Sequence, residues 1–272
     1  MVYLVIHFRS NNIKCFKLNQ KILIYKNMIT LFTTLYEKNK DYLLSDNNQM
    51  TNINFDLITE KIIGINNVNL KLEDYEKMKN LTDKYNIHFL IINDSVDKVK
   101  NFFNLDINDK TLGYYYTIQY FSFILNCKTD YLLLCASDCD PVINDDYLIN
   151  SINELNDEDV ITTSVIWGGD NNKIPDFYPA IGEQEFTFNF LNIEKENKNF
   201  WYNIGFSDQF FMTKIDKIKN CDFNLYHKLG DRFPGYGGMS FEKRLSNYLT
   251  INKKFRAIYN KGYYTTKKYN DR

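Results

Sequence analysis

The chain has 272 residues, which is enough for one large α/β domain or two small ones. Its 33 basic and 34 acidic residues leave a net charge of −1, so there is no electrostatic basis for binding a nucleic-acid backbone, which needs clustered Lys and Arg. The five Cys residues form no CxxC pair, and no apolar run approaches the ~18 residues of a membrane span. We therefore expect a cytoplasmic protein with reduced thiols, no transmembrane segment and no nucleic-acid partner.

The first half of the chain alternates short apolar runs with longer amphipathic segments. The short runs predict buried strands, and the segments with apolar residues three and four apart predict helices. The strands expected here are 2–8, 58–65, 88–92 and 131–135, and the helices are 25–43, 72–85 and 112–126. This alternation predicts a mostly parallel sheet with right-handed crossovers, and in such sheets ligands bind at the carboxyl ends of the strands.

The pattern changes in the second half. Ser240 is a residue type that favours the N-cap of a helix, and helical spacing follows it. We expect helices at 147–155 and 240–251, strands at 159–167, 206–213 and 255–259, a short helix after the second of these strands, and a loop at 168–179. Since no linker rich in Pro, Gly or Ser and no internal repeat divides the chain, we expect a single domain.

The segment YLLLCASDCDP, residues 131–141, carries the strongest chemical signal. An apolar strand leads into Asp138 and Asp140, and in an extended strand the side chains at i and i+2 point the same way. Two such carboxylates suit Mg²⁺ or Mn²⁺, and the cation would offset their repulsion of a bound diphosphate. The alternative is a solvated Asp turn before the helix that begins near Asp146.

At this point the chain resembles the GT-A glycosyltransferases, especially those similar to family 2, over about residues 87–264. The resemblance rests on the long helix before the strand YLLLC, on SDCDP, on GFSDQFFMTK (205–214) and on GGMSFEKRL (237–245). It implies an α/β, GT-A-like (Rossmann-like) fold: a mixed, mostly parallel central sheet flanked by helices. Residues 1–146 would bind a UDP- or GDP-sugar, and residues 147–272 would bind a glycan or other hydroxyl acceptor.

The resemblance also implies an inverting, metal-dependent transfer. Glu242 falls where the family places its catalytic base, although Phe241 replaces the first acid of the usual Glu-Asp pair. The alternative is that Glu242 is a first-turn residue favoured by the helix dipole. Asp208 would orient the acceptor. Many relatives supply a metal-binding His after the last strand, where this chain has Tyr and Thr at 263–265, so His227 is the remaining histidine for the metal or the diphosphate.

Other residues are weaker candidates for binding the nucleotide sugar. Asp94 resembles the base- or ribose-binding Asp of the family's DDxS element, and an Asx turn is the competing interpretation. His7 and Arg9 end the strand predicted at 2–8, where the base would rest, and Arg9 would pair with a phosphate or lie at the surface. Lys110 would contact the diphosphate, and Trp167 would stack on a sugar ring or belong to the core.

Two other functions compete with sugar transfer. A strand followed by DxD also opens the phosphatases of the haloacid dehalogenase type, in which Asp138 would be the nucleophile and Asp140 the acid. Against this, the motif lies in the middle of the chain and Pro141 follows it. The other alternative is a non-catalytic GT-A-like module that binds a sugar nucleotide or a saccharide without turnover.

Overall fold

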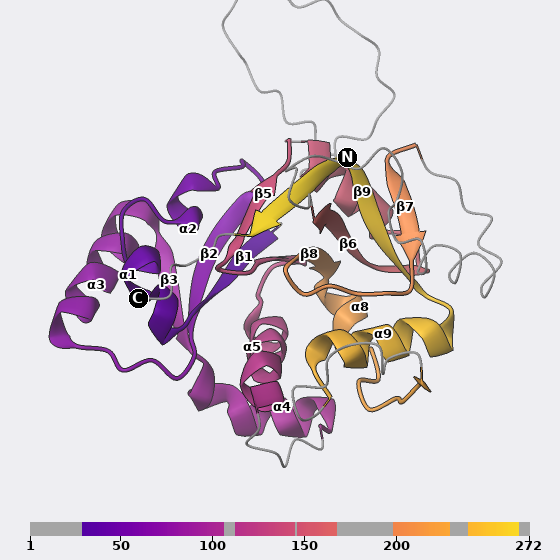
Figure 1. Cartoon of the computed structure of the whole chain (residues 1–272), viewed down its shortest axis with the longest axis horizontal. Helices are drawn as coiled ribbons and strands as arrows, with labels where there is room; N and C mark the ends of the chain where they lie inside the picture. Colours follow the sequence, from indigo (N-terminus) through magenta and orange to yellow (C-terminus); the bar gives the residue numbers. More distant parts are fainter. Residues whose placement is uncertain (1–28, 106–111, 145, 168–197, 229–238, 267–272) are drawn as a thin grey trace, which may run out of the picture.

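A computed structural model describes residues 29–105, 112–144, 146–167, 198–228 and 239–266. Within these residues the chain forms one nine-stranded mixed sheet in the order β3-β2-β1-β4-β8-β6-β9-β5, with β7 paired to β9 (Figure 1). The strands are β1 (Ile29–Leu35), β2 (Ile58–Ile65), β3 (Ile87–Ile91), β4 (Tyr131–Cys135), β5 (Cys139–Val142), β6 (Val160–Trp167), β7 (Phe200–Asn203), β8 (Phe210–Lys214) and β9 (Phe255–Thr266).

The strands of the first half run parallel, and those of the second half are largely antiparallel. β3, β2, β1 and β4 pair in parallel, so their carboxyl ends lie at one edge of the sheet. β8 then runs antiparallel to both β4 and β6, and β5 and β7 run antiparallel to β9. The mixed α/β fold with a central sheet and flanking helices is therefore confirmed.

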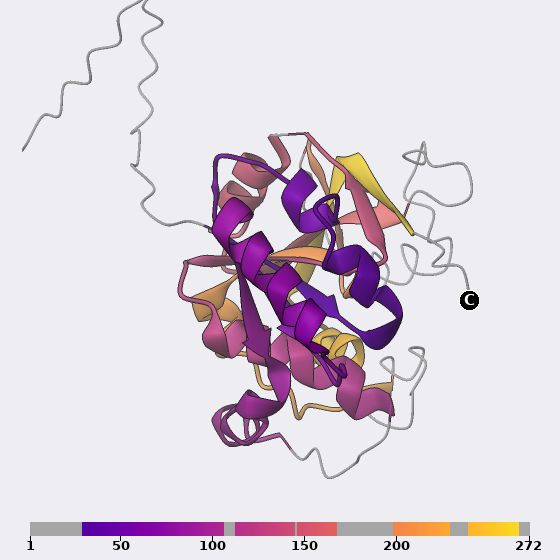
Figure 2. The ribbon, with the colours of Figure 1, turned by 90° about the vertical axis from the view of Figure 1, so that its left-hand side faces the viewer.

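Helices cover both faces of this sheet. α1 (Lys40–Leu43), α2 (Gln49–Asn52), α3 (Leu72–Tyr85) and α6 (Asp146–Glu154) contribute to one hydrophobic cluster, and α4 (Val96–Phe103), α5 (Leu112–Asn126), α8 (Ile215–Lys219) and α9 (Phe241–Asn252) contribute to the other. Figure 2 shows α3 crossing the sheet on the first face, while Figure 1 shows α5 beside α8 and α9. Along β1 the side chains alternate between the clusters, with Leu31 in the first and Phe32 in the second.

The helix predicted at 25–43 is wrong over residues 29–35, which form a strand, and only its end is helical. Ile29–Leu35 is β1, followed by the 3-10 helix η1 (Glu37–Asn39) and by α1. All seven residues of β1 are buried, since the strand lies between β2 and β4 and under helices on both faces. A strand buried on both faces has no polar alternation, and β-branched residues such as Thr33 favour it over a helix.

Several other predicted elements are confirmed at their stated bounds. The structure has 58–65, 72–85, 112–126 and 131–135 as β2, α3, α5 and β4. Ser240 is the N-cap of α9, where its side chain accepts a hydrogen bond from the Lys243 N–H. The strand predicted at 255–259 continues to Thr266, because its second half pairs with β5. The strand predicted at 2–8 and the loop at 168–179 lie outside the described residues.

Among the helices described, none combines the length and apolarity that are needed to cross a bilayer.

Candidate active site

A cavity of about 420 Å³ lies where the carboxyl ends of β1 and β4 meet. Its walls come from five places: the end of β1 with the segment after it, the middle of α5, the turn after β4, the segment before β8, and the start of α9. Three acidic residues line it, Asp138, Asp208 and Glu242, together with one lysine, Lys38. The cavity thus brings together three of the residues that the sequence pointed to, from segments far apart in the chain.

The two aspartates of the DxD motif do not lie on one extended strand. The Cys139 N–H donates to the Ala136 carbonyl at 2.9 Å, which closes a turn between β4 and β5. Asp138 lies within this turn, is partly buried and lines the main cavity, while Asp140 follows in β5, is exposed and lines a second, smaller cavity. The extended geometry predicted for this segment is wrong, because Asp138 belongs to the turn formed by residues 136–139 and Asp140 belongs to the strand that follows it.

Buried amides hold the turn in place. The Asn39 Nδ2 donates to the Ser137 Oγ at 2.5 Å. The Gln49 Nε2 lies 3.3 Å from the carbonyl oxygens of both Cys135 and Ala136. Asn39 and Gln49 are nearly inaccessible to solvent, so these bonds are shielded from water. The position of the turn is therefore set by η1 and α2, which belong to the segment between β1 and β2.

On the other side of the cavity Asp208 and Glu242 form a carboxyl pair. The Asp208 N–H donates to the Glu242 Oε1 at 3.0 Å. Glu242 lies in the first turn of α9, which Ser240 caps, and Asp208 lies just before β8. Two residues 34 positions apart in sequence are therefore brought into direct contact by the packing of α9 against the strand ends.

The surroundings shift the pKa values of the two carboxyl groups by different amounts. Burial raises the pKa of Asp208 well above its usual range, and the neighbouring charge of Glu242 raises it further. Burial also raises the pKa of Glu242, but the hydrogen bonds from Asp208 oppose the rise. Tyr120 adds a hydrogen bond to the carboxyl of Asp208. Of the two carboxyl groups, Asp208 therefore holds a proton more strongly, and Glu242 loses its proton more readily.

The wall formed after β1 contains an aromatic residue held by a polar network. The Tyr36 hydroxyl donates to the Gln119 Oε1 at 2.5 Å, and the Asn66 Nδ2 donates to the same oxygen at 3.1 Å. The Tyr36 N–H donates to the Asn39 Oδ1 at 2.7 Å. Tyr36 and Gln119 both line the cavity, so this wall presents a fixed ring and a fixed amide to any ligand.

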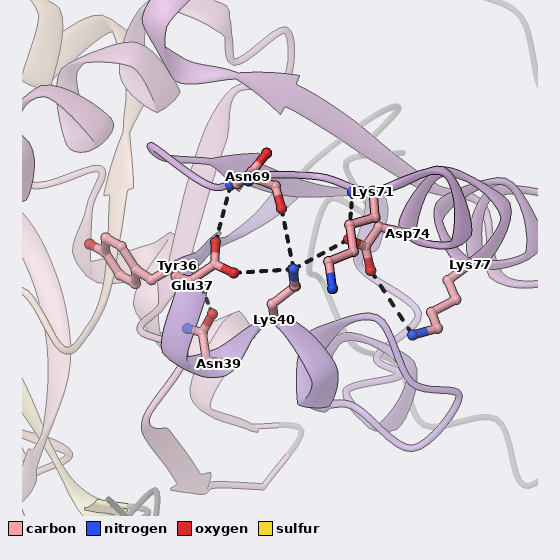
Figure 3. A network of polar contacts seen from close by, with 8 residues as sticks. All are labelled: Tyr36, Glu37, Asn39, Lys40, Asn69, Lys71, Asp74 and Lys77. Atoms are coloured by element: carbon pink, nitrogen blue, oxygen red, sulfur yellow. Dashed lines mark hydrogen bonds and ion pairs between the residues drawn. The ribbon is translucent and has the colours of Figure 1, made fainter. Parts of the chain in front are cut away.

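An ion-pair network outside the cavity anchors the same segment (Figure 3). The Lys40 Nζ lies 3.1 Å from the Glu37 Oε1 and 3.3 Å from the Asp74 Oδ2. Glu37 also accepts the Asn69 N–H at 3.1 Å, and Asp74 accepts the Lys71 N–H at 2.9 Å at the start of α3. The segment that carries Tyr36 and Lys38 is thereby tied to α3.

Other predicted site residues lie away from this cavity or cannot be placed. Asp94 is exposed in the 3-10 helix η2 (Ile92–Ser95) after β3, and His227 is half-buried between α8 and α9; neither lines the two cavities. Trp167 is the last residue of β6 and pairs with Tyr264 of β9. Three predicted residues lie outside the described residues: His7, Arg9 and Lys110.

The cavity lining also includes residues that were not predicted from the sequence, among them Tyr36, Lys38, Gln119 and Tyr120. Tyr36 and Lys38 follow β1, and recognising that strand would have placed them at a carboxyl end, where ligands bind. Gln119 and Tyr120 belong to α5, whose many aromatic residues hide them among core positions. No local signal separates these two from their buried neighbours.

The carboxyl-rich lining fits a divalent cation that is held jointly by protein and substrate. Among the described residues no three His, Cys, Asp or Glu side chains are grouped to hold a metal ion by themselves. Mg²⁺ commonly takes only one or two carboxylates and completes its shell with water and substrate phosphates. Asp138, which is partly exposed to the cavity, suits that arrangement.

Comparison with solved structures identifies the fold. A structure of GalNAc-T7 with UDP, GalNAc and Mn²⁺ matches with a TM-score of 0.53 and 10% sequence identity over 88% of this chain and 44% of that one. TarS (residues 1–349) from S. aureus in complex with UDP-GlcNAc matches with a TM-score of 0.44 and 13% identity over 89% of this chain and 58% of that one. No family model and no curated protein matches the sequence.

The chain has the GT-A fold of glycosyltransferases, as the resemblance implied. At these identities the likeness extends to the fold and no further. The chain also spans only about half the length of the proteins it matches, between 36% and 60% of each. What the chain does therefore has to be argued from its own site.

Proposed function

We propose that this chain is a glycosyltransferase that moves a sugar from a UDP- or GDP-sugar to a hydroxyl group of a glycan or another acceptor. One observation carries the proposal: the cavity at the strand ends of a GT-A fold has Asp138 on one wall and the Asp208–Glu242 pair on another. The first wall suits the diphosphate of the donor, and the second suits the deprotonation of an acceptor.

The charges in the cavity support a cation-assisted donor site. A diphosphate next to carboxylates is repelled by roughly 4 kcal/mol per close pair at an intermediate dielectric. Lys38 is the one basic residue among those described that line the cavity, so it offsets only part of this repulsion. A divalent cation held by Asp138 would neutralise the donor phosphates and the charge that develops on the leaving diphosphate. Tyr36 and Gln119 would line the part of the cavity that holds the nucleoside of the donor.

The carboxyl pair supports base catalysis by Glu242. Asp208 holds a proton more strongly than Glu242 does, so Glu242 is the member of the pair that would accept the proton of the acceptor hydroxyl. The hydroxyl oxygen forms a bond to the anomeric carbon, and the bond from that carbon to the diphosphate breaks with its electron pair on the leaving group. Displacement in one step from the opposite face inverts the anomeric centre. Asp208 orients Glu242 through its own hydrogen bond, and Tyr120 in turn hydrogen-bonds to the carboxyl of Asp208.

The test is nucleotide release from a panel of UDP- and GDP-sugars, with Mn²⁺ and with a chelator. Slow release without acceptor, dependent on the cation and accelerated by a hydroxyl acceptor, is the expected result. Binding of the donors with no release for any acceptor would instead indicate a non-catalytic module. Hydrolysis of p-nitrophenyl phosphate that depends on Asp138 would indicate a phosphatase.

A further inference from the structure

Four side-chain amides form a chain of hydrogen bonds that ends at the main cavity. The Asn93 Nδ2 donates to the Asn67 Oδ1 at 3.1 Å, and the Asn67 Nδ2 donates to the Asn66 Oδ1 at 3.0 Å. The Asn66 Nδ2 then donates to the Gln119 Oε1 at 3.1 Å. The chain runs from η2, through the segment that follows β2, to the middle of α5. Since all its members donate in the same direction, each bond polarises the next.

The hydroxyl of Tyr36 fixes the direction of this chain. It lies 2.5 Å from the Gln119 Oε1, a separation that suits an O–H···O bond and is too short for the usual N–H···O bond. The atom of Gln119 that faces Tyr36 and Asn66 is therefore the amide oxygen, which accepts from both. The amide nitrogen is left on the other side, where it can only donate.

This amide nitrogen opens onto the cavity. Gln119 lines the cavity and is only 3% exposed, so the protein holds nearly all of its side chain. The Nε2 has no hydrogen-bond partner among the described residues, yet it is not one of the unpaired polar atoms that are sealed from solvent. A ligand can therefore reach it. A fixed donor in a buried wall selects for an acceptor, because a second donor placed against it would leave both groups unpaired.

The nucleotide bases differ in the group that they would present to this donor. Uracil and guanine carry a ring carbonyl, which accepts, whereas cytosine and adenine carry an amino group, which donates. Thr34 lines the same cavity at the end of β1, and its hydroxyl both donates and accepts. It therefore fits a ring nitrogen of either kind, and the discrimination falls to Gln119.

We propose that Gln119 is the residue that selects the base of the donor, and that it admits bases with a keto group. The cavity then takes UDP- or GDP-sugars and rejects CDP- and ADP-sugars. This inference rests on the proposed function and deepens it by naming the residue that reads the base. Asp94, which the resemblance assigned to the base or the ribose, does not line this cavity.

The test is calorimetric binding of UDP, GDP, CDP and ADP to the full chain in the presence of Mn²⁺. UDP or GDP should bind at least about tenfold more tightly than CDP and ADP, since an unpaired buried donor costs at least that much. Gln119→Met removes the donor at similar size and should abolish most of this preference. Gln119→Glu keeps an oxygen for Tyr36 and Asn66 and puts an acceptor in place of the donor. At mildly alkaline pH it should shift the preference toward CDP.

Thr34→Val is the matched control, because it removes a hydroxyl from the same wall and leaves the donor in place. It should weaken UDP and CDP alike and keep their ratio. Equal binding of all four nucleotides by the native chain, or a native preference in both Gln119 variants, would overturn the inference and leave the proposed transfer standing. A native chain that binds none of the four would count against the donor site and the inference together. A preference for keto bases that depends on Gln119, without any release from nucleotide sugars, would count against transfer alone.

Discussion

Replacing Glu242 by Gln is the sharpest test of the proposed chemistry. Gln has nearly the same shape, and its Oε1 still accepts the Asp208 N–H that lies 3.0 Å from it in the native chain, so the loop before β8 stays in place. What is lost is the basicity of the carboxylate. General-base catalysis typically contributes about 10²- to 10⁴-fold, which corresponds to about 3 to 5 kcal/mol in activation free energy. We expect a fall in turnover of that size, with donor affinity little changed.

The pH dependence of turnover in the native chain is a second test of the role proposed for Glu242. Burial raises the pKa of Glu242 above its ordinary value of 4.5, so the base is lost at a higher pH than an exposed glutamate would be. Turnover should therefore rise with pH through this raised pKa, and the residual turnover of Glu242→Gln should lack this rise.

Single-turnover release of nucleotide, followed across mildly acidic to mildly alkaline pH, measures both effects. Glu158→Gln, at an exposed position after α6, is the matched control and should behave as the native chain. If Glu242→Gln keeps most of the native turnover and the native pH profile, Glu242 is not the base and the assignment of the carboxyl pair is wrong.

Asp208→Asn should raise the melting temperature at neutral pH. The pKa of Asp208 is raised, so ionising Asp208 is less favourable in the folded state than in the unfolded state, and the native chain loses stability as the pH rises above the ordinary value of 3.8. The gain in melting temperature of Asp208→Asn should therefore grow with pH; an equal gain at every pH in thermal melts would contradict this. Asp138→Asn should weaken Mn²⁺-dependent UDP binding in calorimetry more than Asp140→Asn, since only Asp138 lines the main cavity. Asp74→Ala should lower the melting temperature relative to Asp83→Ala, an exposed α3 control, because it removes the acceptor of the Lys71 N–H and the partner of Lys40; equal melting of the two variants would refute this.

Elements with a one-sided pattern could be predicted from the sequence. α3 has apolar residues at helical spacing on a charged background, and Asn86 ends it in the left-handed conformation with φ of 54°. The strand 131–135 is a short apolar run preceded by the polar Thr129 and Asp130, and its bounds were predicted correctly. In such segments local preference and tertiary environment agree, so the sequence suffices.

Elements defined by distant partners could not be predicted in this way. β1 is buried on both faces, so its hydrophobic periodicity alone does not distinguish it from a buried helix. β5 has only four residues and exists because it pairs with residues 263–266 of β9. The same reason explains why the extended geometry predicted for the DxD motif is wrong. Asp138 lies in the turn that leads into β5, and β5 is formed by antiparallel pairing with the distant β9.

Under the proposed function, the carboxyl pair completes in space a motif that is incomplete in the sequence. The family pattern has two adjacent acids, but position 241 is Phe, which is 1% exposed and stacks on Tyr120 with ring centroids 4.8 Å apart. A carboxylate at that position would be buried among aromatic rings without a counter-charge, at a high cost in free energy. Asp208 supplies the second carboxyl from another segment and hydrogen-bonds to Glu242 instead. A sequence search that requires two adjacent acids would not find this pair. The two carboxyl groups come together only when α9 packs on the segment before β8.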